Sequence, residues 1–479
     1  MTENKFNVLF APFQLSRHVN SCTAPVQVLN GWRVAVRSVV HYNISVYKMS
    51  SQKPALGEFT GCSLLMLISG SLPLLKVEGL DFPAALSLTY GSLLLLMRDA
   101  HVKTLNPALT LVDVLRNQVE TGAGLMLILC QFAGAAVGAF GLSVLVGSSS
   151  QSFPASVGAP PTGQLMVIQL VFGAALAFAY IRGGEGGKYD GPWLGALMYG
   201  SFVLGGEATA FLNPAVALGA NVCRGISGMS TNEATLATLV FLPLLAAGLA
   251  FLLDRVSEQH LQMSELVGCF FLSFGLLAAA AKGSTSAAAG PAAVGFAFYA
   301  AAIVRMASPA SGGSLNPAVT GGALLSESRS ISKDVATVWL FQLCGAAAAA
   351  LLLGRVGTAA GAAAPAAAAS IAGDWQATAL SLGVSALLMI AYCTDFGDFF
   401  GSPAAAFIGA VYGLSLMASK APLPINPAVT LGAAAAVLFK EAAALNLLEM
   451  LAEVALPFGG CICGAALLRL IPSEYKRRL

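Results

Sequence analysis

Apolar stretches long enough to cross a membrane follow one another along most of this chain. The hydrocarbon core of a bilayer is about 30 Å thick and takes roughly 20 apolar residues per helix. Because only short polar connectors separate the stretches, the pattern predicts an all-α membrane protein. We assign twelve spans, at about residues 59–77, 82–99, 122–146, 164–182, 191–206, 235–253, 264–281, 290–308, 335–354, 375–393, 402–419 and 445–470.

Basic residues are distributed unevenly among the segments that join these spans. Connectors 147–163 and 357–373 contain no Lys or Arg, whereas the N-terminal extension 1–57 and the C-terminal tail 473–479 are basic. An even number of spans places both ends on one side of the membrane, and basic segments favour the cytosol. We therefore expect both termini in the cytosol, of a plasma or an intracellular membrane.

The tripeptide Asn-Pro-Ala occurs four times in the chain. At ordinary amino-acid usage only about 0.1 copies would arise by chance, so the four copies form an internal repeat. The residues around them repeat too, as in Leu315-Asn-Pro-Ala-Val-Thr and Ile425-Asn-Pro-Ala-Val-Thr. The motif residues are Asn106, Pro107, Ala108, Asn213, Pro214, Ala215, Asn316, Pro317, Ala318, Asn426, Pro427 and Ala428.

Other landmarks repeat at a separation of 207 to 214 residues, which indicates a larger unit copied in tandem. We expect one six-span unit at 58–254 and a second at 264–472, joined by the connector 255–263. Each unit then consists of two three-span halves, which their odd number of spans forces into opposite orientations. The paired landmarks are Glu58 with Glu265, Gln131 with Gln342, Gln169 with Gln376, and Pro243 with Pro457.

Each Asn-Pro-Ala motif predicts a helix that begins abruptly at its proline, because Asn is a preferred N-cap and Pro a preferred first residue. The segment from each motif to the next span is too short to cross the membrane, so we expect four re-entrant half-helices. Irregular backbone at membrane depth persists where protein buries it or a watery cavity solvates it. Two facing helix N-termini concentrate positive charge, which repels cations, while the Asn amides can donate to a neutral solute.

This arrangement resembles the aquaporin, or major intrinsic protein, family over about residues 58–472. The resemblance rests on paired Asn-Pro-Ala motifs three spans apart, on the segment from Ser311 to Thr320, on a Glu in the first span and on Gln131-Phe-Ala-Gly-Ala. It implies two tandem six-helix bundles, an unusual duplicated form of the family, with one pore each for water or for glycerol, urea or hydrogen peroxide. The family's buried support residues would be Glu58, Glu265, Gln169 and Gln376.

The outer selectivity filter departs from the family pattern. Typical members carry an Arg directly after the second motif, where this chain has Val216 and Val429. Counting at the family's spacing gives an apolar ring in the second unit and a roomier mouth in the first, in which Leu86 is an alternative to Tyr90. We expect glycerol-sized solutes to pass the first unit and little besides water or gas-like solutes to pass the second. The expected filter residues are Tyr90, Ser201, Ala210, Val216, Phe296, Leu414, Leu423 and Val429.

Composition narrows the function classes further. The chain is 57% hydrophobic and only 10% charged, and its mean hydropathy is +0.76. A net charge of +2 gives no basic field for nucleic acid, and the four His are too scattered for a metal cluster. We expect no enzyme, no cofactor and no metal, because no set of nucleophile, base and metal ligands converges.

The same sequence features are compatible with two other functions, and the duplication predicts a mode of assembly. An apolar second filter fits a non-conducting membrane scaffold, and inverted repeats with broken helices also occur in secondary transporters. A transporter would need ionisable residues near the midplane, of which the spans carry few. Aquaporins commonly form tetramers, so two units per chain predict a homodimer that forms a pseudo-tetramer in the lipid bilayer.

Overall fold

The computed structural model describes residues 53–76, 81–100, 102–146, 153, 162–183, 190–283, 286–326, 335–355, 375–394, 403–417, 423–438 and 447–470. The expected cytosolic extension lies outside the described residues up to position 52, and the basic tail 473–479 lies outside them entirely. Residues 54–479 form one compact unit, whose described part consists of helices joined by loops.

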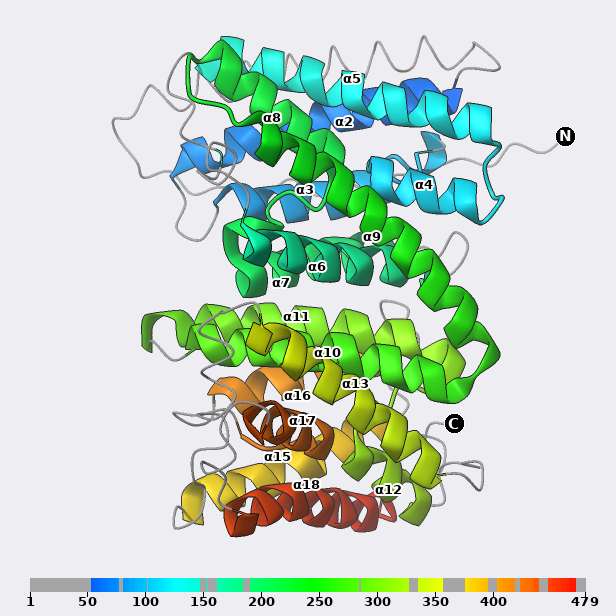
Figure 1. The fold of residues 1–479 in the computed structure, drawn as a ribbon, viewed down its shortest axis with the longest axis vertical. Coiled ribbons are helices and arrows are strands. Elements are labelled where there is room, and N and C mark those ends of the chain that lie inside the picture. The colour runs from blue at the N-terminus through cyan, green and yellow to red at the C-terminus, as the bar shows by residue number, and fades with distance from the viewer. Residues whose placement is uncertain are drawn as a thin grey trace, which may run out of the picture. The chain divides into compact units, whose positions relative to one another are not determined.

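Eight α-helices form the first half of the described chain, residues 53–259 (Figure 1). The helices are α2 (Lys53–Ser71), α3 (Phe82–Leu96), α4 (Pro107–Leu115), α5 (Thr121–Val146), α6 (Gly163–Arg182), α7 (Asp190–Gly205), α8 (Pro214–Ile226) and α9 (Glu233–Gln259). Two of them, α4 and α8, are short helices that begin at an Asn-Pro motif; α2 and α3 precede the first, α5 to α7 lie between them and α9 follows the second.

The second half, the described residues between 261 and 470, also forms eight α-helices, in the same order of long and short elements. The expected connector 255–263 is helical except at His260, because α9 runs to Gln259 and the next helix begins at Leu261. The helices are α10 (Leu261–Gly283), α11 (Ser286–Ser311), α12 (Pro317–Leu325), α13 (Val335–Arg355), α15 (Trp375–Cys393), α16 (Pro403–Met417), α17 (Pro427–Leu438) and α18 (Leu447–Leu468).

Nine helical segments in the described ranges are long and apolar enough to cross a membrane. Three further helices that we counted as spans, α3, α7 and α16, are only 15 or 16 residues long. At 1.5 Å per residue such a helix covers about 23 Å of the roughly 30 Å hydrocarbon core. The helices therefore support a multi-pass membrane protein, whereas the number of spans depends on how the three short helices sit in the bilayer.

Equivalent helices pack on each other in the two halves. Helix α3 packs on α7 as α11 packs on α16, and α5 packs on α8 as α13 packs on α17. Glycines permit a further equivalent pair of close contacts, between α2 and α5 and between α10 and α13: a Cβ on Gly134 would collide with the Phe59 carbonyl oxygen, and one on Gly345 with that of Leu266. Small residues of this kind let helix backbones approach closely where no hydrophobic effect drives helix association.

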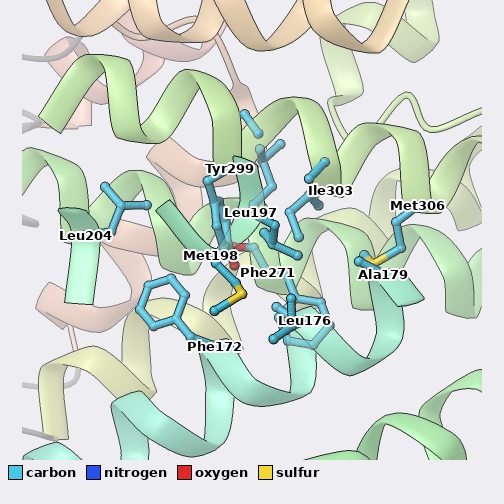
Figure 2. Close-up of a cluster of buried hydrophobic side chains, with 14 of the residues drawn as sticks. Phe172, Leu176, Ala179, Leu197, Met198, Leu204, Phe271, Tyr299, Ile303 and Met306 are labelled. Atoms are coloured by element: carbon cyan, nitrogen blue, oxygen red, sulfur yellow. The ribbon is translucent and has the colours of Figure 1, made fainter. Parts of the chain in front are cut away.

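The two halves meet through α6 and α7 of the first and α10 and α11 of the second (Figure 2). The ring of Phe172 lies edge-on to that of Tyr299, with centroids 5.4 Å apart, and edge-on to that of Phe274 at 5.5 Å. Such aromatic pairs contribute about 0.5–1.5 kcal/mol beyond the area they bury. The halves are therefore packed together directly by aromatic and aliphatic side chains.

Candidate pore sites

All four Asn-Pro motifs start a short helix at the proline, as the sequence predicts. Each Asn side-chain oxygen accepts a hydrogen bond from the amide N–H two residues later. These N–O distances are 2.9 Å at Ala108, 3.0 Å at Ala215, 2.9 Å at Ala318 and 3.1 Å at Ala428. The caps fix where each helix begins and which way its N-terminus points.

The two Asn side chains of each half reach across to the opposite motif. The amide nitrogen of Asn106 donates to the carbonyl of Leu212 at 3.4 Å, and that of Asn213 donates to the carbonyl of Leu105 at 2.7 Å. In the second half, the Asn316 amide donates to Ile425 at 2.8 Å, and the Asn426 amide donates to Leu315 at 2.9 Å.

These reciprocal bonds place the N-termini of α4 and α8 next to each other, and likewise those of α12 and α17. Each helix N-terminus carries roughly half a positive charge. A cation at either meeting point is therefore repelled, while a neutral molecule with an acceptor oxygen can take a hydrogen bond from an Asn amide. All four Asn residues are almost completely buried.

A buried carboxylate holds the chain that leads into α4. The two oxygens of Glu58 accept hydrogen bonds from the backbone N–H groups of Lys103, Thr104 and Leu105 at 2.8–3.1 Å. Gln131 donates to the same carboxylate at 2.8 Å. Three backbone donors that a sharp turn would leave unpaired are thus satisfied by one side chain.

The second half repeats this arrangement with fewer bonds. One oxygen of Glu265 accepts from the Ser314 hydroxyl at 3.1 Å, from the Leu315 N–H at 2.9 Å and from Gln342 at 2.7 Å. Its other oxygen has no hydrogen-bond partner among the described residues. The turn has the same backbone conformation in both halves, since Leu105 and Leu315 both adopt a left-handed backbone with φ of 48°.

The prediction that Gln376 is a buried support residue is wrong. It is exposed in the first turn of α15, whereas Gln169 is completely buried in α6. Matching Tyr180 with Tyr392 near the ends of these helices pairs Gln169 with Ser381 instead. Ser381 is buried, and its hydroxyl donates to the Pro424 carbonyl at 2.8 Å, so it holds the chain before α17.

The expected filter residues of the first half are all buried. Ser201, Ala210 and Val216 come from α7, the loop before Asn213 and α8. Tyr90 has a supporting role instead of the expected filter role: its hydroxyl donates to the Thr104 carbonyl at 2.7 Å and so stabilises the turn into α4. Leu86, one helical turn earlier on α3, is also buried.

In the second half, the prediction that Leu414 is a filter residue is wrong. Its side chain is 44% exposed, on the same side of α16 as the exposed Phe407 and Met417. Two close glycine contacts give the register: Gly195 of α7 lies against the Ser87 carbonyl, and Gly409 of α16 lies against that of Ala297. Counting from these glycines, Ser415 takes the place of Ser201, because the chain before Asn426 is one residue shorter.

The same register makes Leu86 the counterpart of Phe296. Phe296, Leu423 and Val429, the other expected filter residues of this half, are buried. Leu423 and Val429 line a small cavity of about 40 Å³ that extends to Asn426. The buried carboxylate of Glu453 on α18 lines it as well, which the sequence reasoning missed although an acid inside an apolar span is a visible signal.

Tyr412 is the second residue that the sequence reasoning missed. Its side chain, 1% exposed, projects from α16, and its hydroxyl accepts hydrogen bonds from the amides of both Asn316 and Asn426 at 3.4 Å. The ring of Phe296 lies edge-on to it, with centroids 6.0 Å apart. The need of a tyrosine hydroxyl inside a span for polar partners is the signal that could have found it.

Both halves therefore contain two opposed, Asn-capped helix N-termini among apolar helices. Residues 252–437, less than half of the chain, match the model of the family described as Major intrinsic protein. No curated protein matches the chain. The matched stretch is similar to the aquaporin family, a family of channels for water or small solutes and not of enzymes, and the apolar helices of the described residues support an integral multi-pass membrane protein.

Proposed function

We propose that this protein is a duplicated aquaporin-type channel whose first half, residues 58–254, forms a pore for water and small neutral solutes such as glycerol, urea or hydrogen peroxide. The observation that carries the proposal is the reciprocal bonding of Asn106 to Leu212 and of Asn213 to Leu105. It brings two positive helix ends to one buried point, where a cation is repelled and a neutral oxygen finds amide donors.

The first half also has the roomier filter. In the register given above, Leu86 and Ala210 of the first half stand where the second half has the larger Phe296 and Leu423, whereas Ser201 and Val216 match Ser415 and Val429. The Ser201 hydroxyl has no hydrogen-bond partner within the described residues, so it is available to a solute hydroxyl. We therefore assign glycerol-sized solutes to this half.

Duplication and assembly belong to the same proposal. The matched landmarks and matched helix pairs support two units, 58–254 and 264–472. The basic residues of segments 1–57 and 473–479 are the ground for proposing both termini on the cytosolic side. Helices α6 and α7 already meet α10 and α11 within the chain, and apolar side chains remain exposed on α3 and α16, among them Leu88 and Phe407. A second copy could cover these faces, so we propose a homodimer with four units.

Swelling of proteoliposomes under an osmotic gradient of water, glycerol, urea or hydrogen peroxide tests the channel. Wild-type protein should raise permeability above the lipid baseline, and Val216→Trp should return it toward baseline by filling the first mouth while leaving both Asn caps in place. Val137→Trp, at a site on α5 that is 53% exposed, is the matched control and should change nothing. Wild-type permeability at the lipid baseline would favour the scaffold and would contradict a channel.

A further inference from the structure

The two Asn pairs differ in what their amide groups contact. A side-chain amide has two N–H donors. In each pair, one N–H of each Asn goes to a backbone carbonyl of the opposite motif. In the first half, Asn106 and Asn213 have no other amide acceptor among the described residues, so their second N–H groups are available to a solute.

In the second half the remaining donors are already used. Asn316 and Asn426 both direct an amide nitrogen at the hydroxyl of Tyr412, at 3.4 Å each. The hydroxyl oxygen thus lies between the two amides, at the place where the oxygen of a passing molecule would accept from them. The 3.4 Å distances are long for hydrogen bonds, so each contact is weak, and the buried position of the Tyr412 ring must help to keep the hydroxyl there.

Ring packing adds a steric component to this contact. Tyr412 is almost fully buried and packs edge-on against Phe296, which is completely buried. A cavity lined by Val429 extends to Asn426, one of the two residues whose side-chain amides contact the Tyr412 hydroxyl. The place equivalent to Tyr412 in the first half, three residues after Gly195, holds Met198, which has no hydroxyl to offer the amides.

We propose that Tyr412 is the residue that closes the second half to solutes, its hydroxyl occupying the amide site that a permeating molecule would use. This inference rests on the proposed function of the motifs as pores. It assigns the closure of the second half to one side chain beside the Asn pair, in addition to the difference between the two outer filters. The second half then conducts only when Tyr412 leaves the amides of Asn316 and Asn426.

The test compares osmotic swelling of proteoliposomes that contain full-length wild-type protein or Tyr412→Met, which installs the residue found in the first half. Two open pores in parallel should give about twice the water permeability of one. Adding Val429→Trp to Tyr412→Met should remove the increase, since residue 429 lines the cavity above Asn426. Tyr199→Met, on a half-buried tyrosine of α7, is the matched control and should leave permeability unchanged.

The outcomes separate this inference from the proposed function. If wild-type protein conducts and Tyr412→Met, eluting as a single species of wild-type size, conducts no more, Tyr412 does not close the second half and the channel assignment stands. If only Tyr412→Met conducts, the inference is supported and the proposed pore of the first half is wrong. If neither conducts, both are overturned.

Discussion

Asn213 donates its side-chain amide to the backbone carbonyl of Leu105, 2.7 Å away and 108 positions earlier in the chain. The contact joins the N-terminus of α8 to the turn before α4, and Leu105 makes it in a left-handed conformation that costs a non-glycine residue about 1–2 kcal/mol. The surrounding bonds must hold that conformation, and the Glu58 carboxylate supplies three of them. The carboxylate and the two Asn residues therefore act as one unit.

Glu58→Gln should weaken this unit. The substituted amide presents an NH2 group where an oxygen now accepts, so one or two buried donors lose their acceptor, at about 1–3 kcal/mol each. We expect a lower thermal unfolding temperature and lower water permeability of the first half. Glu207→Gln, at an exposed acid just before the second motif, is the control and should leave both unchanged. An unchanged unfolding temperature for Glu58→Gln would show that the turn holds without the carboxylate.

Gly345→Ala should destabilise the second half. The added methyl group would collide with the Leu266 carbonyl oxygen, which is backbone and cannot move aside as a flexible side chain can. Overpacking of this kind costs about 1–3 kcal/mol and should part α10 from α13. Gly383→Ala on α15 is the control, because no atom lies near its added methyl group. Thermal unfolding of the two variants should differ, and equal stability would contradict such tight packing.

Asp254→Asn should loosen the end of the first half. Asp254 pairs with Arg182 at 2.6 Å, and both side chains are about nine-tenths buried. Removing one partner of such a pair leaves the other charge buried, at a cost of about 3–5 kcal/mol. The double variant Arg182→Leu/Asp254→Leu removes both charges and should regain much of the loss. Thermal unfolding of the two single variants and the double variant, analysed as a double-mutant cycle, measures the coupling between the two side chains. If the stability losses of the single variants simply add up in the double variant, the pair is not coupled.

The sequence predicts those features of the fold and the site that depend on residues close together in the chain. The start of each half-helix is set by an Asn and a Pro next to each other, so the motif alone predicts it correctly. Local chemistry does not predict the role of Glu58, because the hydrogen bonds of its carboxylate reach residues 45 to 47 positions away. Only the family resemblance led to that expectation.

Register across loops could not be predicted. The spacing to Asn426 led to Leu414 and missed Ser415, because one residue fewer in a loop rotates a helix position by about 100°. The prediction for Gln376 was wrong for a similar reason. Gln376 was matched with Gln169 by their separation alone, and the sequence does not show where α15 begins. Tyr412 was missed because its role depends on the side of α16 that faces the Asn pair, which only the packed helices reveal.

Met198→Tyr tests the register argument in the opposite direction from Tyr412→Met. If Met198 occupies the place in α7 that Tyr412 occupies in α16, a tyrosine there should reach the amides of Asn106 and Asn213, and swelling should fall toward the lipid baseline. Combining it with Tyr412→Met should restore the flux and make it sensitive to Val429→Trp instead of Val216→Trp, because the open pore has moved to the other half. Met126→Tyr, at an exposed position of α5, is the matched control and should not change the flux. Full swelling through Met198→Tyr would show that the two positions are not equivalent, and that the open first half owes its conduction to something other than a missing hydroxyl.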